Sequence, residues 1–179
     1  MTRLNRYLAT ALLGTIAGAA GAAPFTDEQR AAVADEVSAF NEAFAAGNLS
    51  EVMMSIPPKV MDGMAEQAGV PVDEFRAMMV QQVEAMMVDV TVDSFEMDLD
   101  AATWVEAPSG EPYALIPTVT EMTMSDQSMR GETQTLAFEA DGEIWLTRIE
   151  NAEQLALLTE AYPELEGIEV PEGSVVPVD

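Results

Sequence analysis

The stretch DGEIWLTRIENAEQLALL, residues 141 to 158, changes its hydrophobic period in the middle and so decides the class of fold. Asp141-Gly142 predicts a two-residue hairpin turn, because both residue types tolerate the positive φ angles of such turns. Residues 143 to 149 predict the strand that closes a sheet. From Asn151 on, apolar residues recur at helical spacing. The stretch therefore joins a sheet to a final helix.

The final helix carries start and stop signals. Asn151 is a good N-cap, and Gln154, three residues later, predicts a capping box. Pro163 ends the helix, because the residue before a proline is pushed out of the helical region. The tail from 164 to 179 contains prolines and has no periodic stripe, so we expect it to be mostly disordered. The inner face of the helix is formed by Leu155, Leu158 and Tyr162.

The last strand poses a question of parity, because successive side chains point to opposite faces. One face carries Ile144, Leu146 and Arg148, and the other carries Trp145, Thr147 and Ile149. If helices cover the first face, Arg148 points into a pocket and favours an anionic ligand. If they cover the second, Trp145 is core and Arg148 lies among surface acids. The second is favoured, because a large aromatic side chain gains more from burial.

Earlier segments predict the other strands. Residues 88 to 100 alternate apolar and polar side chains, and the parity changes near Ser94, which predicts a β-bulge. A strand follows over 113 to 124, where Pro117 favours an edge or a bulge. A hairpin then leads into the strand 131 to 140, which precedes the last strand. An antiparallel meander is therefore expected.

Helices are expected before the meander. Residues 26 to 46 predict a helix capped by Thr26 or Asp27, and Gly47 suits a left-handed stop. Its inner stripe is Val33, Val37, Phe40 and Phe44. Further helices are expected between Asn48 and Pro57, from Pro58 to about Gln67, and over residues 72 to 87. This order predicts an α+β fold with N-terminal helices packed on one face of a curved antiparallel sheet, followed by a C-terminal helix.

The first 22 residues have the features of an export signal. A basic start precedes an apolar stretch from Tyr7 to Ala19, and Ala20 and Ala22 suit the positions before a signal-peptidase cut. The alternative is an uncleaved anchor, but the apolar run is short beside the roughly 20 residues of a membrane span. We expect cleavage, a periplasmic or extracellular location, and one domain over residues 23 to 163.

The charge is extreme. After cleavage the chain keeps 32 acidic and five basic side chains, a formal charge of −27. Such a surface repels nucleic acid and anionic membranes, since both require Lys and Arg to neutralise phosphates. It would attract divalent cations or a basic partner. Because the acidic residues are dispersed, a solvated acidic surface is the favoured interpretation.

The residue types that are absent narrow the chemistry. The chain has no His and no Cys, which excludes histidine-based triads, thiol nucleophiles and ordinary zinc sites. Carboxylate chemistry remains, because a buried carboxyl with a raised pKa can serve as a base. The candidates expected to face a pocket are Tyr113, Glu121, Asp98 and Arg148. They do not form a recognisable catalytic set, and no cofactor is predicted.

Methionine is abundant, with 12 residues after the initiator. Thioethers bind Cu(I), and Met61 with Met64, or Met122 with Met124, share one face of an element. Methionine more often fills a core or lines an adaptable apolar groove. We therefore expect no metal site, and we add Met79 and Met86 to the pocket candidates.

Two segments carry a family resemblance. FNEAFAAGNLSEVMMSIPP, residues 40 to 58, resembles the start of nuclear-transport-factor-two-like or cystatin-like domains, and DGEIWLTRI, residues 141 to 149, resembles their closing strand. Residues 55 to 75 are similar to a piece that recurs in exported bacterial proteins. The helix after residue 150 departs from the family pattern. The resemblance implies a pocket between helix and concave sheet.

The resemblance also bears on function, because such folds include isomerases, dehydratases and pure binding modules. We expect a non-catalytic exported module that binds a small apolar molecule or a protein partner in a Met-rich pocket or groove. One alternative is a small isomerase or dehydratase with a buried carboxylate facing Tyr113 or Arg148. A further alternative is Cu(I) binding through methionine.

Overall fold

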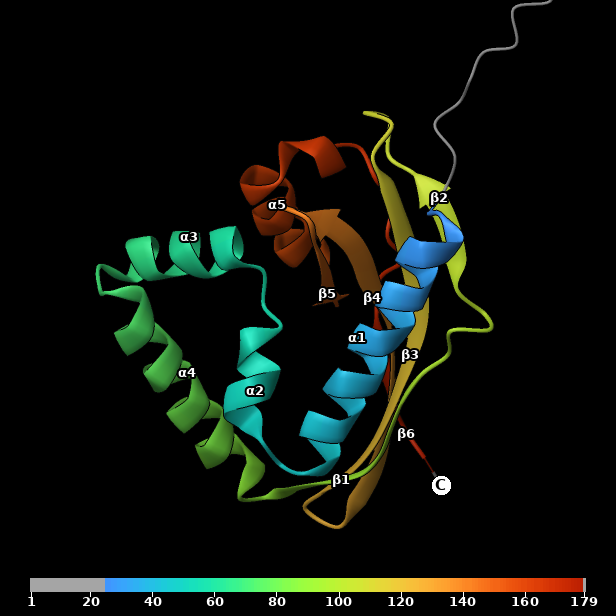
Figure 1. Ribbon diagram of the computed structural model, residues 1–179. Helices are drawn as coiled ribbons and strands as arrows, with labels where there is room; N and C mark the ends of the chain where they lie inside the picture. Colours follow the sequence, from blue (N-terminus) through green and yellow to red (C-terminus); the bar gives the residue numbers. More distant parts are fainter. Residues whose placement is uncertain (1–24, 179) are drawn as a thin grey trace, which may run out of the picture.

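The computed structural model describes residues 25–178, apart from the side chains of Leu49, Ser50 and Met53 (Figure 1). The expected export signal lies outside the described residues. The elements are α1 (Asp27–Ala45), α2 (Leu49–Met54), α3 (Pro58–Ala68), α4 (Val72–Met87), β1 (Val90–Met97), β2 (Thr103–Glu106), β3 (Pro112–Met124), β4 (Gln127–Ala140), β5 (Glu143–Ile149), α5 (Ala152–Ala161), the 3₁₀ turn η1 (Pro163–Leu165) and β6 (Ser174–Pro177). The strands pair antiparallel, which confirms the α+β class.

The helices begin and end where local signals place them. Thr26 caps α1 in a complete capping box with Gln29, and Gly47 follows the helix with a φ of 67°. Pro58 occupies the first turn of α3, where its missing N–H costs no hydrogen bond. Gly69 closes α3 in the left-handed conformation. These ends are set by a few neighbouring residues, which is why they could be predicted.

The β3–β4 hairpin is the centre of the sheet. Its register is continuous from the pair Tyr113 and Phe138 to the pair Met124 and Gln127. The turn consists of Ser125 and Asp126, both with positive φ, at 51° and 64°. Such two-residue turns match the right-handed twist of the strands they join. The hairpin is so long that no single neighbouring strand spans either of its edges.

The outer edge of β3 is shared by β1 and β2. β2, which the sequence did not predict, pairs near the start of β3, and β1 pairs with β3 from Thr118 to Met124. Pro117 lies in the gap between them, and its carbonyl accepts the Asp98 N–H at 2.9 Å. The edge prediction for Pro117 is wrong for the strand, because β3 is central. The proline is tolerated because neither β1 nor β2 pairs with it.

The outer edge of β4 is shared in the same way by β5 and β6. β5 pairs with residues 134–140 and β6 with residues 129–132. The chain leaves the edge after β5, forms α5, and returns with Gly173, whose N–H donates to the Glu150 carbonyl at 3.1 Å. A disordered tail was expected from residue 164, and this prediction is wrong. The tail instead supplies the missing part of the edge.

Helices cover both faces of the sheet, so the expectation of a single covered face is wrong. In Figure 1, α1 lies across one side of the sheet, while α5 lies beside β5 on the other. The α1-side cluster comprises Phe25, Val33, Val37, Met97, Ala114, Ile116, Ala137 and Leu146. The α5-side cluster comprises Ala107, Tyr113, Leu136, Phe138, Ala140, Ile149, Leu158, Tyr162, Leu165 and Ile168. α3 joins the α5 side, where the Lys59 ammonium lies 4.8 Å from the Tyr162 ring.

The parity question at β5 therefore has a different answer from either expectation. Leu146 is buried against α1 and Ile149 against α5, so both faces of the strand are core. Trp145 is half-buried against the α5-side cluster, as favoured. The predicted hairpin before β5 is confirmed, with Asp141 at a φ of 55°. At the helix that follows, Asn151 caps as expected, but the Gln154 side chain accepts the Glu150 N–H instead of completing a capping box.

The ordered tail yields a stability prediction. Replacing Leu165, which is fully buried beside Phe138 and Tyr162, with alanine should lower the free energy of unfolding by about 2–5 kcal/mol, because the change leaves a cavity. Val175→Ala in exposed β6 should change it by less than about 0.5 kcal/mol. Urea denaturation measures both. Equal, negligible effects would show that the tail does not pack on the sheet.

Candidate functional site

The candidates chosen from the sequence are scattered over the molecule. Tyr113 is buried in the α5-side cluster, and Asp98 is exposed in the connection after β1. Met79 is half-buried on α4, whereas Met86 has an exposed fraction of 64%. Arg148 lies on the α1 side of β5, and its guanidinium is 2.9 Å from the Glu150 carboxylate. They are spread over α4, the connection after β1, β3 and β5.

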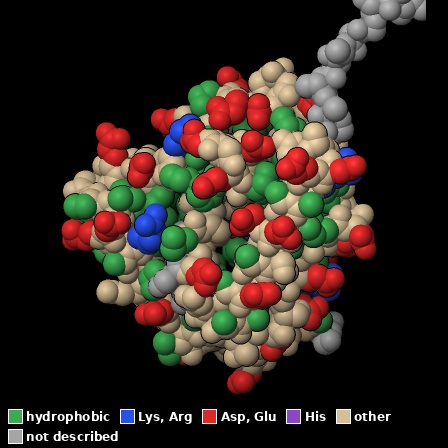
Figure 2. All heavy atoms as spheres, viewed as in Figure 1, with side chains coloured by type: hydrophobic (Ala, Val, Ile, Leu, Met, Phe, Trp, Pro, Cys, Tyr) green, Lys and Arg blue, Asp and Glu red, His purple; other side chains and the backbone are tan. Residues whose placement is uncertain are grey.

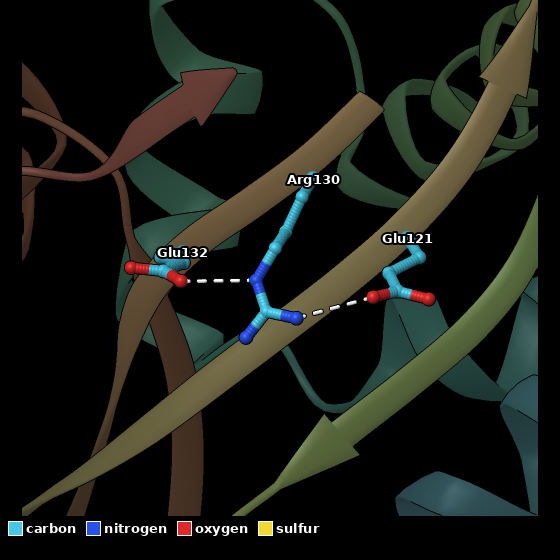
Figure 3. A network of polar contacts seen from close by, with 3 residues as sticks. All are labelled: Glu121, Arg130 and Glu132. Carbon is cyan, nitrogen blue, oxygen red and sulfur yellow. Dashed lines mark hydrogen bonds and ion pairs between the residues drawn. The ribbon is translucent and has the colours of Figure 1, made fainter. Parts of the chain in front are cut away.

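Glu121, another candidate, belongs to an ion-pair network (Figure 3). Its parity on β3 is that of Tyr113, which places the network on the α5 side of the sheet. The Arg130 guanidinium lies 3.1 Å from Glu121 and 3.0 Å from Glu132. The hydrogen bond to Glu132 is the largest cause of a raised pKa at Arg130. All three side chains are substantially exposed, and exposed pairs contribute little to stability. The network links β3 to β4. Within it, the Glu121 carboxylate pairs with the Arg130 guanidinium.

The structure instead presents a groove of about 600 Å³ between α1, α2 and the start of β5, called here the α1–α2–β5 groove. It lies at the outer edge of β5, the end strand of the sheet path. None of the candidates chosen from the sequence lines it. The lining residues are Ala32, Glu36, Ala39, Phe40, Ala43, Glu51, Met54, Ser55, Gly142, Glu143, Ile144, Trp145 and Leu146.

The α1 wall owes its shape to small side chains. Four lining residues of α1 recur at spacings of four, three and four, so they form one stripe along the helix. They are Ala32, Glu36, Ala39 and Ala43. This stripe lies directly beside the buried Val33 and its neighbours. Alanine projects only a methyl group, so the wall stands back from the sheet. The space that larger side chains would fill is the space of the groove.

The floor of the groove is the outer edge of β5. The two-residue turn makes Ala140 and Glu143 a hydrogen-bonded pair, and bonded and non-bonded pairs then alternate along the hairpin. The N–H and C=O groups of Ile144 and Leu146 therefore point away from β4. Among residues 25–178, no backbone group pairs with this edge. The groove thus combines apolar side chains with unpaired main-chain donors and acceptors.

Carboxylates surround the opening of the groove. Glu36 comes from α1, Glu51 from α2 and Glu143 from β5, and all three are exposed. Figure 2 shows acidic side chains spread over the viewed face of the molecule with few basic ones among them. The Ser55 hydroxyl already donates to the Val52 carbonyl at 2.6 Å. The polar side chains of the lining are therefore three carboxylates and a hydroxyl that is already hydrogen-bonded to the backbone. They do not form a pair of nucleophile and base.

The described part of the chain was also searched for acidic metal sites and for membrane spans. Residues 25–178 contain no group of three or more acidic side chains placed to hold a metal ion. Their helices are also too short or too polar to cross a bilayer. The register places Met122 opposite Met129, and Met61 is fully buried in α3. Copper binding through methionine stays a prediction.

The chain was compared with protein-family models, curated proteins and solved structures, and none of the three comparisons gave a match. The site must therefore be interpreted from its own geometry.

The sequence held one signal that points to the groove. Each of three residues of the inner stripe of α1 is directly preceded by an alanine. The stripe residues are Val33, Phe40 and Phe44, and the alanines are at positions 32, 39 and 43. Small residues in phase beside a core stripe indicate a wall that stands back from its neighbour. The edge of β5 gave no signal, because which strand ends a sheet depends on pairings between distant segments.

Two buried tyrosines give a pH prediction. Burial is the largest cause of a raised pKa at Tyr113 and at Tyr162, and Glu169 raises the pKa of Tyr113 further. At Tyr162 the neighbouring Lys59 backbone lowers the pKa and nearby carboxylates raise it, so the net direction is upward. The Tyr162 hydroxyl lies beside the Lys59 backbone without a hydrogen bond of normal geometry. Because the folded pKa of each tyrosine exceeds the unfolded value of about 10, the contribution of these two side chains to stability should be constant below that pH and be lost as the pH rises above it.

The variant Tyr162→Phe should keep wild-type stability at pH 7 within about 0.5 kcal/mol, because no well-formed hydrogen bond is lost. It should also reduce the loss of stability above pH 10, and Tyr113 should account for part of the loss that remains. Urea denaturation between pH 7 and 11 makes the comparison. An unchanged alkaline loss would contradict this assignment.

Proposed function

We propose that the chain is an exported, non-catalytic binding module and that the α1–α2–β5 groove is its binding site. One observation carries the proposal: an open strand edge lies in a groove of about 600 Å³ with an alanine wall. Grooves of this volume, lined mostly by apolar groups with a few polar ones, are the usual form of a ligand site. The resemblance to nuclear-transport-factor-two-like domains, which include many binding modules, agrees with this function.

The alternative of a pocket enzyme required a buried carboxylate facing Tyr113 or Arg148. The carboxylate that influences Tyr113 is Glu169, and the partner of Arg148 is Glu150. Both are exposed, so neither is the buried carboxylate that this alternative requires. No observation in the described residues favours catalysis over binding.

The chemistry of the groove limits its ligands. Phe40, Met54 and Leu146 offer apolar contact, and methionine adapts its shape to what it touches. The glutamates at the opening disfavour anions and favour neutral or cationic groups. The preferred ligand therefore has an apolar body and carries no negative charge.

Filling the groove tests this proposal. The neutral apolar dye Nile red should bind the protein saturably, with a rise in fluorescence. Ala39→Phe should weaken binding at least about tenfold, because the ring occupies the space beside the α1 wall. Ala34→Phe, at another exposed position of α1 outside the groove, should leave the affinity within about twofold. The readout is dye fluorescence titrated against each variant.

Circular dichroism would show that both variants keep the fold, since both positions are exposed. If Ala39→Phe binds the dye as tightly as the unchanged chain, the groove is not the binding site.

A further inference from the structure

We propose that the occupant of the α1–α2–β5 groove is an extended polypeptide segment rich in lysine or arginine, which adds to the outer edge of β5 as a further strand. This inference rests on the proposed binding function and specifies the partner. Three features carry it: the unpaired edge, the room beside it, and the charge around it.

The unpaired edge selects a backbone as the ligand. Ile144 and Leu146 direct their main-chain N–H and C=O groups outward, at the spacing of alternate residues in a strand. An added strand satisfies this row with its own main chain, which is how many domains capture extended peptides. A small apolar molecule would fill the groove and leave these groups without partners. The edge therefore favours a polypeptide over a small molecule.

The groove has room for the side chains of such a strand. Side chains of an extended segment alternate between two faces, so every second one would point toward α1. There the wall is formed by Ala32, Ala39 and Ala43, which leave the volume that incoming side chains need. Met54 of α2 is 65% exposed and can close over them. The apolar contacts supply affinity.

The charge selects a cationic segment and opposes a second copy of this chain. Glu36, Glu51 and Glu143 surround the opening, and the mature chain carries a formal charge of −27. An acidic partner, including another copy paired edge to edge through β5, would meet this charge with its own. Lysine or arginine on the bound strand would instead pair with the glutamates and speed association.

Calorimetry with designed peptides tests the proposal on the chain without residues 1–22. The probe is a blocked octapeptide of alternating Lys and Val. One control replaces each Lys with Glu, and the other keeps the Lys–Val sequence but methylates every backbone nitrogen. The first control reverses the charge, and the second removes the main-chain donors while keeping the charge. We expect the probe to bind at least about tenfold more tightly than either control.

Variants of the protein locate the site. Ala39→Phe should weaken the probe at least about tenfold, and Ala34→Phe should not. The double variant Glu36→Gln and Glu143→Gln should weaken it, whereas Glu42→Gln with Glu84→Gln, which removes the same charge from exposed positions outside the groove, should have a smaller effect.

Each contrary result overturns a defined part of the proposal. Equal binding of the methylated peptide means that charge alone attracts the probe, and strand addition is wrong. Equal binding of the Glu–Val peptide overturns the cationic preference. A stable dimer in sedimentation that blocks the probe means that a second copy occupies the edge.

If Nile red responds to Ala39→Phe but the probe does not bind, only this inference fails. If neither ligand responds to Ala39→Phe, the proposed function fails as well.

Discussion

The length of the β3–β4 hairpin determines how the other strands are arranged in the sheet. Its two strands, of 13 and 14 residues, are longer than the other strands within residues 25–178, so each outer edge needs two partners. β2 and β1 divide the edge of β3, and β5 and β6 divide the edge of β4. Each division forces the chain to leave the sheet and return. The gap at Pro117, the α5 excursion and the ordered tail all follow from this mismatch in length.

The same hairpin explains why both faces of the sheet are buried. α1 precedes the sheet and covers one face, while α5 arises from the break in the β4 edge and covers the other. The α5 excursion takes the chain away from the edge after β5, and the tail returns only as β6, which pairs with residues 129–132 of β4. Among the described residues, nothing pairs with the outer edge of β5. The groove is thus a consequence of how the edges are shared, and the alanines of α1 keep it open.

Much of the fold could be predicted because the deciding signals are local. The capping box at Thr26, the left-handed Gly47 and the Asp141-Gly142 turn each involve a few adjacent residues. The bulge near Ser94 could be predicted from a change of parity alone, and the register confirms it. The four-residue β2 has core on both faces, so Trp104 and Val105 show no alternation to detect. β6 lies in a tail with prolines and becomes a strand only because β4 offers an unpaired edge.

The candidate site could be predicted far less well. Tyr113, Glu121 and Arg148 were chosen for their chemistry, but long-range pairing decides position, and it separates them. The groove depends instead on small side chains and on main-chain groups, which have no distinctive residue type.

Residue-resolved amide hydrogen exchange of the free protein tests the open edge of β5 most directly. The amides of Trp145 and Thr147, which point toward β4, should be strongly protected, whereas those of Ile144 and Leu146, which point into the groove, should exchange much faster. Equally slow exchange at all four positions would show that another segment or another copy already pairs with this edge, and would contradict the assignment of the groove as an unoccupied strand-binding site.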